Sequence, residues 1–439
     1  MRGRDGEFSE RAGATGWIAA CALPGLLLFS LSAAPAFADS VRSRLKAFEK
    51  EWKSGAVKEP FERGQKLRKL AEIDDGDAVR LVLELGLDED ESFEVHDVAI
   101  DVLRQFKGKA ARTWLIQKGP KLRDERHRAA LAGVYATLST DEAVAGLLPL
   151  LEDRDEGVVL AALDESGKVR DRRLVDAVVK RLADQTGVMR AACVDALAGM
   201  TGKFDLKTPD EWKTWWEARR DSFDFSKVPQ RRRGTRERST RGKLSTTTDG
   251  SAIYESIISE NVVFIVDVSG SMEIKVEDDK GRSMSRLDYV RRELKAAIET
   301  QLGDSARFNI LVFSDTVKGW KPRLGKASSS ARKSAGRFLD RLKPGGGTNV
   351  YNALEKAFSD KKVDTIYLLT DGHPTVGDVV VPTQIRGKVR AWNRGRNVRI
   401  HTVAFLTGKD PDVIEDTSGA KLFMRNIARD NNGSFRAME

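Results

Sequence analysis

The sequence predicts two folded regions, an all-α helical-repeat region followed by an open, doubly wound α/β region. The chain has 439 residues, which is more than one domain usually holds. Apolar residues recur at helical spacing up to about residue 225, whereas short β-branched runs alternate with amphipathic helices from residue 257. A hydrophobic content of 40% and a charged content of 32% fit a soluble globular protein and exclude a membrane-embedded or disordered chain.

The first 38 residues have the layout of a signal peptide. Arginines precede an apolar stretch at residues 17–31, and the small residues Ala36 and Ala38 then suit signal peptidase. We therefore expect cleavage after Ala38 and export to the periplasm, the cell surface or the medium. The alternative is an uncleaved anchor, the only case in which we expect a membrane association. After cleavage Cys193 is the single cysteine, so the mature chain forms no internal disulfide.

Residues 39–225 are predicted to form the helical domain, and a weak internal repeat suggests its architecture. The segment 157–162 (GVVLAA) is similar to the segment 187–192 (GVMRAA), and the two are offset by about thirty residues. Asp-rich turns followed by Val and paired Ala resemble HEAT-like helical repeats, in which small residues let helices approach closely. An ordinary helical bundle is the alternative.

A short helix is predicted to begin at Pro209, with Thr208 as its cap. Trp212, Trp215 and Trp216 lie on its adjoining turns. We interpret them as a cap over the apolar face of the last repeat, with a ligand-stacking surface as the alternative.

The excess positive charge is concentrated in one segment. The formal net charge is +9, yet residues 227–243 alone contain eight basic residues and one acid among Thr, Ser and Gly. Such a run is usually a solvated linker, so we assign residues 226–255 as a basic linker and do not favour a nucleic-acid partner.

The α/β domain is predicted at residues 256–439. The continuous apolar runs 262–266 and 366–369 are typical of parallel strands that are covered on both faces. Residues 308–313 and 398–405 resemble flanking strands, and the helices between them predict a Rossmann-like sheet with helices on both sides.

Polar residues follow the predicted strands. Asp267, Ser269 and Ser271 occur at alternate positions after the run 262–266, so an extended chain points all three side chains the same way. Thr348, in a glycine-rich loop, and Asp371, after the run 366–369, should reach the same carboxyl edge of the sheet, where ligands bind. One carboxylate with two hydroxyls is a hard oxygen site, suited to Mg²⁺ or Mn²⁺.

Three motifs together resemble the von Willebrand factor type A domain. They are VVFIVDVSGSM (262–272), GGTN (346–349) and LLTDG (368–372), in that order. The resemblance implies a metal-ion-dependent adhesion site that holds Mg²⁺, or Mn²⁺ or Ca²⁺. It also implies direct ligation by Ser269 and Ser271, direct or water-mediated ligation by Thr348, and mostly water-mediated contacts from Asp267 and Asp371.

A cation held by neutral hydroxyls and waters keeps residual charge and a free coordination position. We therefore expect an exported, non-enzymatic interaction protein that holds an Asp or Glu of a protein partner through the metal, with the helical repeats as scaffold. The alternative for the five candidate ligands is that they only shape polar turns and bind no metal.

Three other functions compete with this interpretation. A metal-dependent hydrolase is disfavoured, because a dehalogenase-type loop requires a second Asp where Ser269 stands and no other nucleophile motif is present. A subunit that works beside an AAA ATPase, as in metal chelatases, would be intracellular, against the signal peptide. The third alternative is a metal-independent scaffold.

Overall fold

The computed structural model describes residues 33–228, 254, 257–277, 281–370, 373–405 and 417–438. By its contacts the chain divides into a unit that ends at Phe48 and a second unit from Glu49 to Glu439. The predicted signal segment up to residue 32 and most of the predicted basic linker lie outside the described residues. The domain boundaries taken from the sequence therefore stay predictions.

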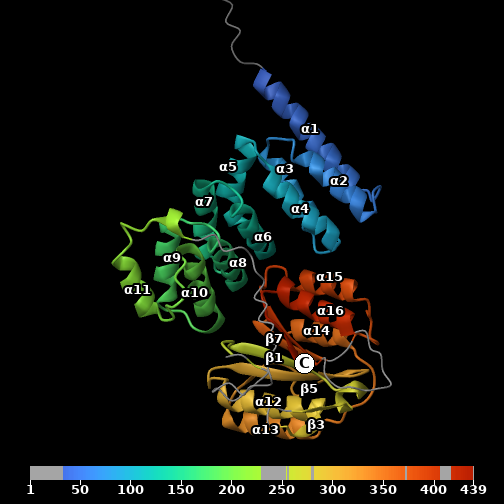
Figure 1. Cartoon of the computed structure of the whole chain (residues 1–439). Coiled ribbons are helices and arrows are strands. Elements are labelled where there is room, and N and C mark those ends of the chain that lie inside the picture. The colour runs from blue at the N-terminus through green and yellow to red at the C-terminus, as the bar shows by residue number, and fades with distance from the viewer. Residues whose placement is uncertain are drawn as a thin grey trace, which may run out of the picture. The chain divides into compact units, whose positions relative to one another are not determined.

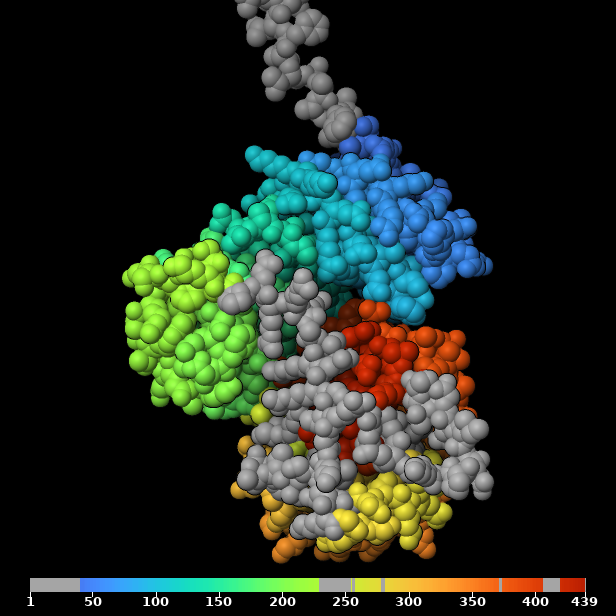
Figure 2. Space-filling model, in the orientation of Figure 1, coloured from blue at the N-terminus to red at the C-terminus, as the bar shows by residue number. Residues whose placement is uncertain are grey.

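The N-terminal region is all helix, as predicted (Figure 1). Its α-helices are α1 (Ala33–Lys53), α2 (Pro60–Leu70), α3 (Gly76–Gly86), α4 (Phe93–Gln105), α5 (Lys109–Lys118), α6 (Glu125–Tyr135), α7 (Thr140–Leu151), α8 (Glu156–Ser166), α9 (Arg172–Leu182), α10 (Gly187–Thr201) and α11 (Pro209–Glu217). Short 3₁₀ turns follow at η1 (Gly119–Lys121) and η2 (Phe225–Lys227). Figure 2 shows the outer surface of the helices from α4 onwards, coloured from cyan to yellow-green.

The two similar hexapeptides occupy equivalent places in this region. One lies in the first turns of α8 and the other at the start of α10, and these two helices pack against each other. A Cβ added at Gly199 of α10 would lie 2.6 Å from the carbonyl oxygen of Gly167, so only glycine permits this approach. A helical unit of about thirty residues thus recurs once, while its assignment as HEAT-like stays a prediction.

The tryptophans of α11 pack onto α9. Trp212 and Trp216 are buried, and the Trp216 indole nitrogen donates a hydrogen bond of 2.8 Å to Asp176. The rings of Trp212 and Trp215 meet edge to face at 5.8 Å. This placement agrees with a cap over the last helices of the region.

The N-terminus of α11 is closed by reciprocal hydrogen bonds. The Glu211 amide donates to the Thr208 hydroxyl at 3.3 Å, and the Thr208 amide donates to the Glu211 carboxylate at 2.8 Å. We expect Thr208→Ala to lower the free energy of unfolding of this part of the chain by about 1 kcal/mol, because one helix-end amide loses its partner. Urea-dependent hydrogen exchange of the α11 amides measures the loss. Thr208→Ser should retain the wild-type value, and a full loss in that variant would contradict the capping argument.

The C-terminal region is built on one mixed sheet with the strand order β5-β4-β1-β7-β8-β9. Its strands are β1 (Asn261–Asp267), β4 (Arg307–Phe313), β5 (Val317–Gly319), β6 (Gly325–Lys326), β7 (Thr365–Thr370), β8 (Arg399–Phe405) and β9 (Phe435–Met438). Strands β4, β1, β7, β8 and β9 are parallel, and β5 and β6 pair antiparallel with β4. The four predicted strands are therefore confirmed, whereas β9 was not predicted. A separate hairpin pairs β2 (Lys275–Glu277) with β3 (Ser283–Ser285).

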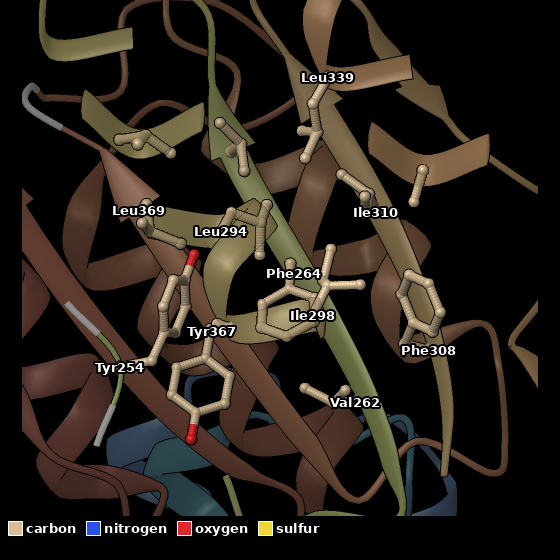
Figure 3. Packing of buried hydrophobic residues seen from close by; sticks show 14 of the residues in the cluster. Tyr254, Val262, Phe264, Leu294, Ile298, Phe308, Ile310, Leu339, Tyr367 and Leu369 are labelled. Carbon is tan, nitrogen blue, oxygen red and sulfur yellow. The ribbon is translucent and has the colours of Figure 1, made fainter. Parts of the chain in front are cut away.

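Helices cover both faces of the sheet, as predicted (Figure 1). They are α12 (Arg286–Thr300), α13 (Ser329–Asp340), α14 (Val350–Phe358), α15 (Pro382–Asn393) and α16 (Thr417–Asp430). Alternate residues of β1 supply two separate cores, with Phe264 facing α12 and α13 and Ile265 facing α14, α15 and α16. Figure 3 shows the first core, in which Phe264 lies beside Tyr254 and Tyr367.

A partly buried carboxylate joins β1 and β7 at the amino ends of these strands. Asp364 accepts hydrogen bonds from the Ser259 hydroxyl and, at 2.9 Å, from the Asn261 amide. Burial raises the pKa of Asp364, and these hydrogen bonds only partly oppose that rise.

The raised pKa of Asp364 predicts a pH dependence of stability. Because the folded state holds this proton more tightly than the unfolded state, the contribution of Asp364 is complete below the unfolded pKa and is lost as pH rises through the folded pKa. We therefore expect the wild type to gain stability relative to Asp364→Asn as pH falls from 7 towards 4. Parallel urea titrations of the two proteins measure the difference, and a constant difference across this range would contradict the prediction.

Among the described helices, none is both long enough and apolar enough to span a membrane.

Candidate metal centre

The first part of the candidate site lies where β1 ends. Asp267 is the last residue of the strand and is fully buried, and its carboxylate accepts a hydrogen bond of 2.7 Å from the Ser269 amide. The hydroxyl oxygens of Ser269 and Ser271 are 3.1 Å apart. The turn η3 (Gly270–Glu273) follows at once, and it redirects the chain away from the sheet. Two hydroxyls are thus held together next to a buried carboxylate.

Backbone hydrogen bonds hold the glycine-rich loop against this turn. The Gly270 amide donates to the Gly346 carbonyl at 3.1 Å, and the Gly345 amide donates to the Val268 carbonyl at 2.8 Å. Thr348 follows in the same loop and is buried. The structure therefore brings the loop that carries Thr348 alongside Ser269 and Ser271.

The fifth predicted residue, Asp371, lies outside the described residues. Its neighbour Thr370 is the last residue of β7 and is buried. The Thr370 hydroxyl donates a hydrogen bond to the second carboxylate oxygen of Asp267. Strand β7 thus ends directly beside the site, and Thr370 joins Asp267 to that strand.

The donor set suits a hard cation. The described part of the chain contains no cluster of three or more His, Cys, Asp or Glu side chains that could hold a metal. The candidate site consists mainly of Ser and Thr hydroxyls around one carboxylate, so it is not a cluster of that type. Oxygen ligands of this kind match Mg²⁺, Mn²⁺ or Ca²⁺ but not Zn²⁺ or copper. The residues present therefore fit the divalent cation that the sequence motifs imply.

Comparison with known families settles the nature of this region. Residues 260–419 match the family model described as "von Willebrand factor type A domain". The α/β region is a von Willebrand factor type A domain. The recognition made from the three motifs is thereby confirmed for this part of the chain.

Individual relatives agree with this assignment of the type A domain. The chain is 27% identical over 166 residues to human "von Willebrand factor A domain-containing protein 3B". The aligned region covers 38% of this chain and 11% of that relative. It is 32% identical over 189 residues to human "Inter-alpha-trypsin inhibitor heavy chain H4", which covers 40% of this chain and 18% of the relative. The chain thus spans less than a fifth of the length of these relatives.

A solved structure, "von Willebrand factor type A from Catenulispora acidiphila", is 23% identical. The matched region covers 42% of this chain and 39% of that structure's chain, with a TM-score of 0.32.

Two residues around the type A site were missed by sequence reasoning. Asp315, which follows β4, accepts a hydrogen bond of 2.8 Å from the Gly347 amide through its carboxylate. Its backbone carbonyl accepts another, of 3.1 Å, from the Asn349 side chain. Arg286, buried at the start of α12, points a guanidinium nitrogen at the Ser271 carbonyl, 3.5 Å away. The position of Asp315 directly after the predicted strand 308–313 was the one available signal.

The histidine next to the predicted motif is on the surface. His373 is exposed, and the helix α16 approaches its ring at Gly419.

Proposed function

We propose that the type A domain binds a divalent cation, Mg²⁺ in the first place, and uses it to hold an Asp or Glu of a protein partner. The proposed ligand set is Asp267, Ser269, Ser271, Thr348 and Asp371. The observation that carries the proposal is the pair of hydroxyls of Ser269 and Ser271, 3.1 Å apart, beside the buried carboxylate of Asp267. Asp267, Ser269 and Ser271 follow one another at the carboxyl end of β1, the edge at which open α/β sheets bind ligands.

The chemistry of the set favours binding of an anion to the metal. Hydroxyls and water are neutral ligands, so the cation keeps most of its charge. A carboxylate from outside then completes the coordination shell, and the contact is strong because two opposite charges meet directly where water is excluded and the local dielectric constant is low. The proposed role is therefore adhesion or assembly and not catalysis.

The wider setting of the proposal comes from the sequence. Residues 1–38 are proposed to direct export, and the helical region is proposed to be a HEAT-like scaffold that carries the type A domain. Two relatives, von Willebrand factor A domain-containing protein 3B and an inter-alpha-trypsin inhibitor heavy chain, have type A regions like this one within much longer proteins. Their similarity supports a binding function for this domain.

The test uses the full mature chain and Mn²⁺ as a spectroscopic probe. We expect saturable Mn²⁺ binding, measured by electron paramagnetic resonance, and displacement of Mn²⁺ by Mg²⁺. Adding a glutamate-containing peptide to the loaded protein should then reduce the water-proton relaxation enhancement, because a carboxylate displaces a coordinated water. Absence of Mn²⁺ binding both with and without the peptide would overturn the proposal.

A further inference from the structure

The segment that follows Asp371 is joined to the Thr348 loop by a reciprocal pair of hydrogen bonds. The Thr375 amide donates to the Thr348 carbonyl at 3.0 Å, and the Thr348 amide donates to the Thr375 hydroxyl at 2.8 Å. Both backbone groups of Thr348 are therefore satisfied by one residue that lies 27 positions later in the chain. Because Thr348 is buried, neither group has ready access to bulk water as a substitute partner.

A second reciprocal pair lies next to the first. The Asn352 side-chain nitrogen donates to the Asp378 carboxylate at 2.6 Å, and the Asp378 amide donates to the Asn352 side-chain oxygen at 3.2 Å. Asn352 is in the first turn of α14, the helix that begins directly after Thr348 and Asn349. Residues 375–378 are thus fastened both to the Thr348 loop and to the helix behind it.

Two glycines make this close approach possible. A Cβ added at Gly347 would lie 3.0 Å from the Thr375 hydroxyl oxygen and from the methyl groups of Val376. Gly377 has a φ of +111°, a backbone conformation that side chains disfavour, and an added Cβ there would collide with the Asn349 side chain. The contact between the two segments is therefore built into the backbone as well as into the side chains.

The opposite side of the Thr348 loop is held by Asp315. Its carboxylate accepts from the Gly347 amide, and the neighbouring Ser314 carbonyl accepts from the Asn349 amide at 3.0 Å. Thr348 consequently lies between two independent attachments, one to the end of β4 and one to residues 375–378. Only the second attachment joins it to the segment that carries Asp371.

We propose that Thr375, Asn352 and Asp378 are positioning residues of the cation site. They fasten residues 375–378 to the Thr348 loop and to α14, and so hold Thr348 in the position from which it would bind the cation. This inference rests on the proposed function, because it assigns a role in cation binding to residues that do not touch the cation. Residues that orient metal ligands from behind typically change affinity by about 10- to 100-fold when they are replaced.

The first test removes one hydroxyl. Thr375→Val keeps the shape of the side chain and the Thr375 amide, but it leaves the buried Thr348 amide without its acceptor. We expect the Mn²⁺ dissociation constant to rise by about 10-fold or more. Thr375→Ser should restore the wild-type value, since its hydroxyl accepts the same bond. Thr316→Val, an exposed threonine of the β4–β5 turn, is the matched control and should bind Mn²⁺ as the wild type does.

The second test exchanges the side-chain amide of Asn352 and the carboxylate of Asp378 between the two positions. Asn352→Asp alone places two carboxylates at a distance of hydrogen-bond contact and should weaken Mn²⁺ binding by about 3-fold, a modest effect because the pair is exposed. Combining it with Asp378→Asn reverses the side-chain bond, so that the amide at position 378 donates to the carboxylate at position 352, while the backbone amide of residue 378 donates to the side chain at position 352 as before. Recovery of the wild-type affinity in the double variant is expected, and equal losses in the single and double variants would contradict the positioning role.

Hydrogen exchange of the Thr348 amide separates this inference from the proposed function. In metal-free protein, Thr375→Val should speed that exchange and Thr375→Ser should not. If the wild type binds Mn²⁺ and Thr375→Val binds it equally well, the positioning role is wrong and the proposed function stands. If the wild type binds no Mn²⁺ either with or without the glutamate-containing peptide, the proposed function fails, and with it the assignment of these residues to a cation site. If Thr375→Val left the exchange rate of the Thr348 amide unchanged, the hydrogen bond to Thr375 would not hold the Thr348 loop, and the proposal would be wrong.

Discussion

Replacing Asp267 by asparagine should weaken Mg²⁺ binding by on the order of 100-fold while leaving the fold intact. The buried carboxylate accepts a hydrogen bond from the Ser269 amide, next to the paired hydroxyls of Ser269 and Ser271. Removing its charge removes an electrostatic attraction for a divalent cation at close range.

The asparagine variant is chosen to preserve the local hydrogen bonds. The side-chain oxygen of asparagine still accepts from the Ser269 amide, and the Thr370 hydroxyl can rotate to accept from the new amide nitrogen. An alanine would remove both of these hydrogen bonds and would confuse lost binding with lost stability.

Isothermal titration of Mg²⁺ into the full mature chain measures the effect of Asp267→Asn. Glu299→Gln is the matched control, because it removes an exposed carboxylate from α12 without touching the site. Equal affinities in the wild type and Asp267→Asn would show that Asp267 has no part in cation binding. Binding of a glutamate-containing peptide should disappear in the same variant, and a chelator should abolish it in the wild type.

Truncating Phe264 to alanine should lower the free energy of unfolding of the type A domain by about 3 to 5 kcal/mol. Phe264 is fully buried in the middle of β1, between the neighbouring strands β4 and β7. Its ring stacks on Tyr367 at 5.6 Å and meets Tyr254 edge to face at 5.4 Å (Figure 3). Removing the ring therefore leaves a cavity and breaks two aromatic contacts at once.

The Phe264 prediction is measured by hydrogen exchange of the β1 and β7 amides in the full chain at increasing urea. This readout reports on the type A domain alone, which matters in a chain with two folded regions. Leu422→Ala is the control, since Leu422 on α16 is 54% exposed and its truncation should change stability by about 0.5 kcal/mol or less. A change below about 1 kcal/mol in Phe264→Ala would show that the core refills the space.

Local patterns of the sequence were enough for the fold class and for the first loop of the site. Two of the four predicted parallel strands, 262–266 and 366–369, were recognisable because strands covered on both faces read as unbroken apolar runs, and the other two were recognisable as strands flanking them. The alternation of Asp267, Ser269 and Ser271 after such a run placed these residues on one side of the chain, and the structure holds two of the hydroxyls 3.1 Å apart. The ligand role of these residues, like that of Asp371, stays a prediction.

Other features depend on the tertiary structure, because they join residues that are far apart in the chain. Strand β9 has too short an apolar pattern to be recognised, and it exists because β8 offers it a parallel partner. The bond between Thr348 and Thr375 spans 27 residues, and that between Asn352 and Asp378 spans 26. No local signal marks such pairs, since Thr, Asn and Asp occur on surfaces for many reasons. Periodicity and motif spacing therefore reveal which residues reach the edge of the sheet, whereas the folded chain decides which of them are held together.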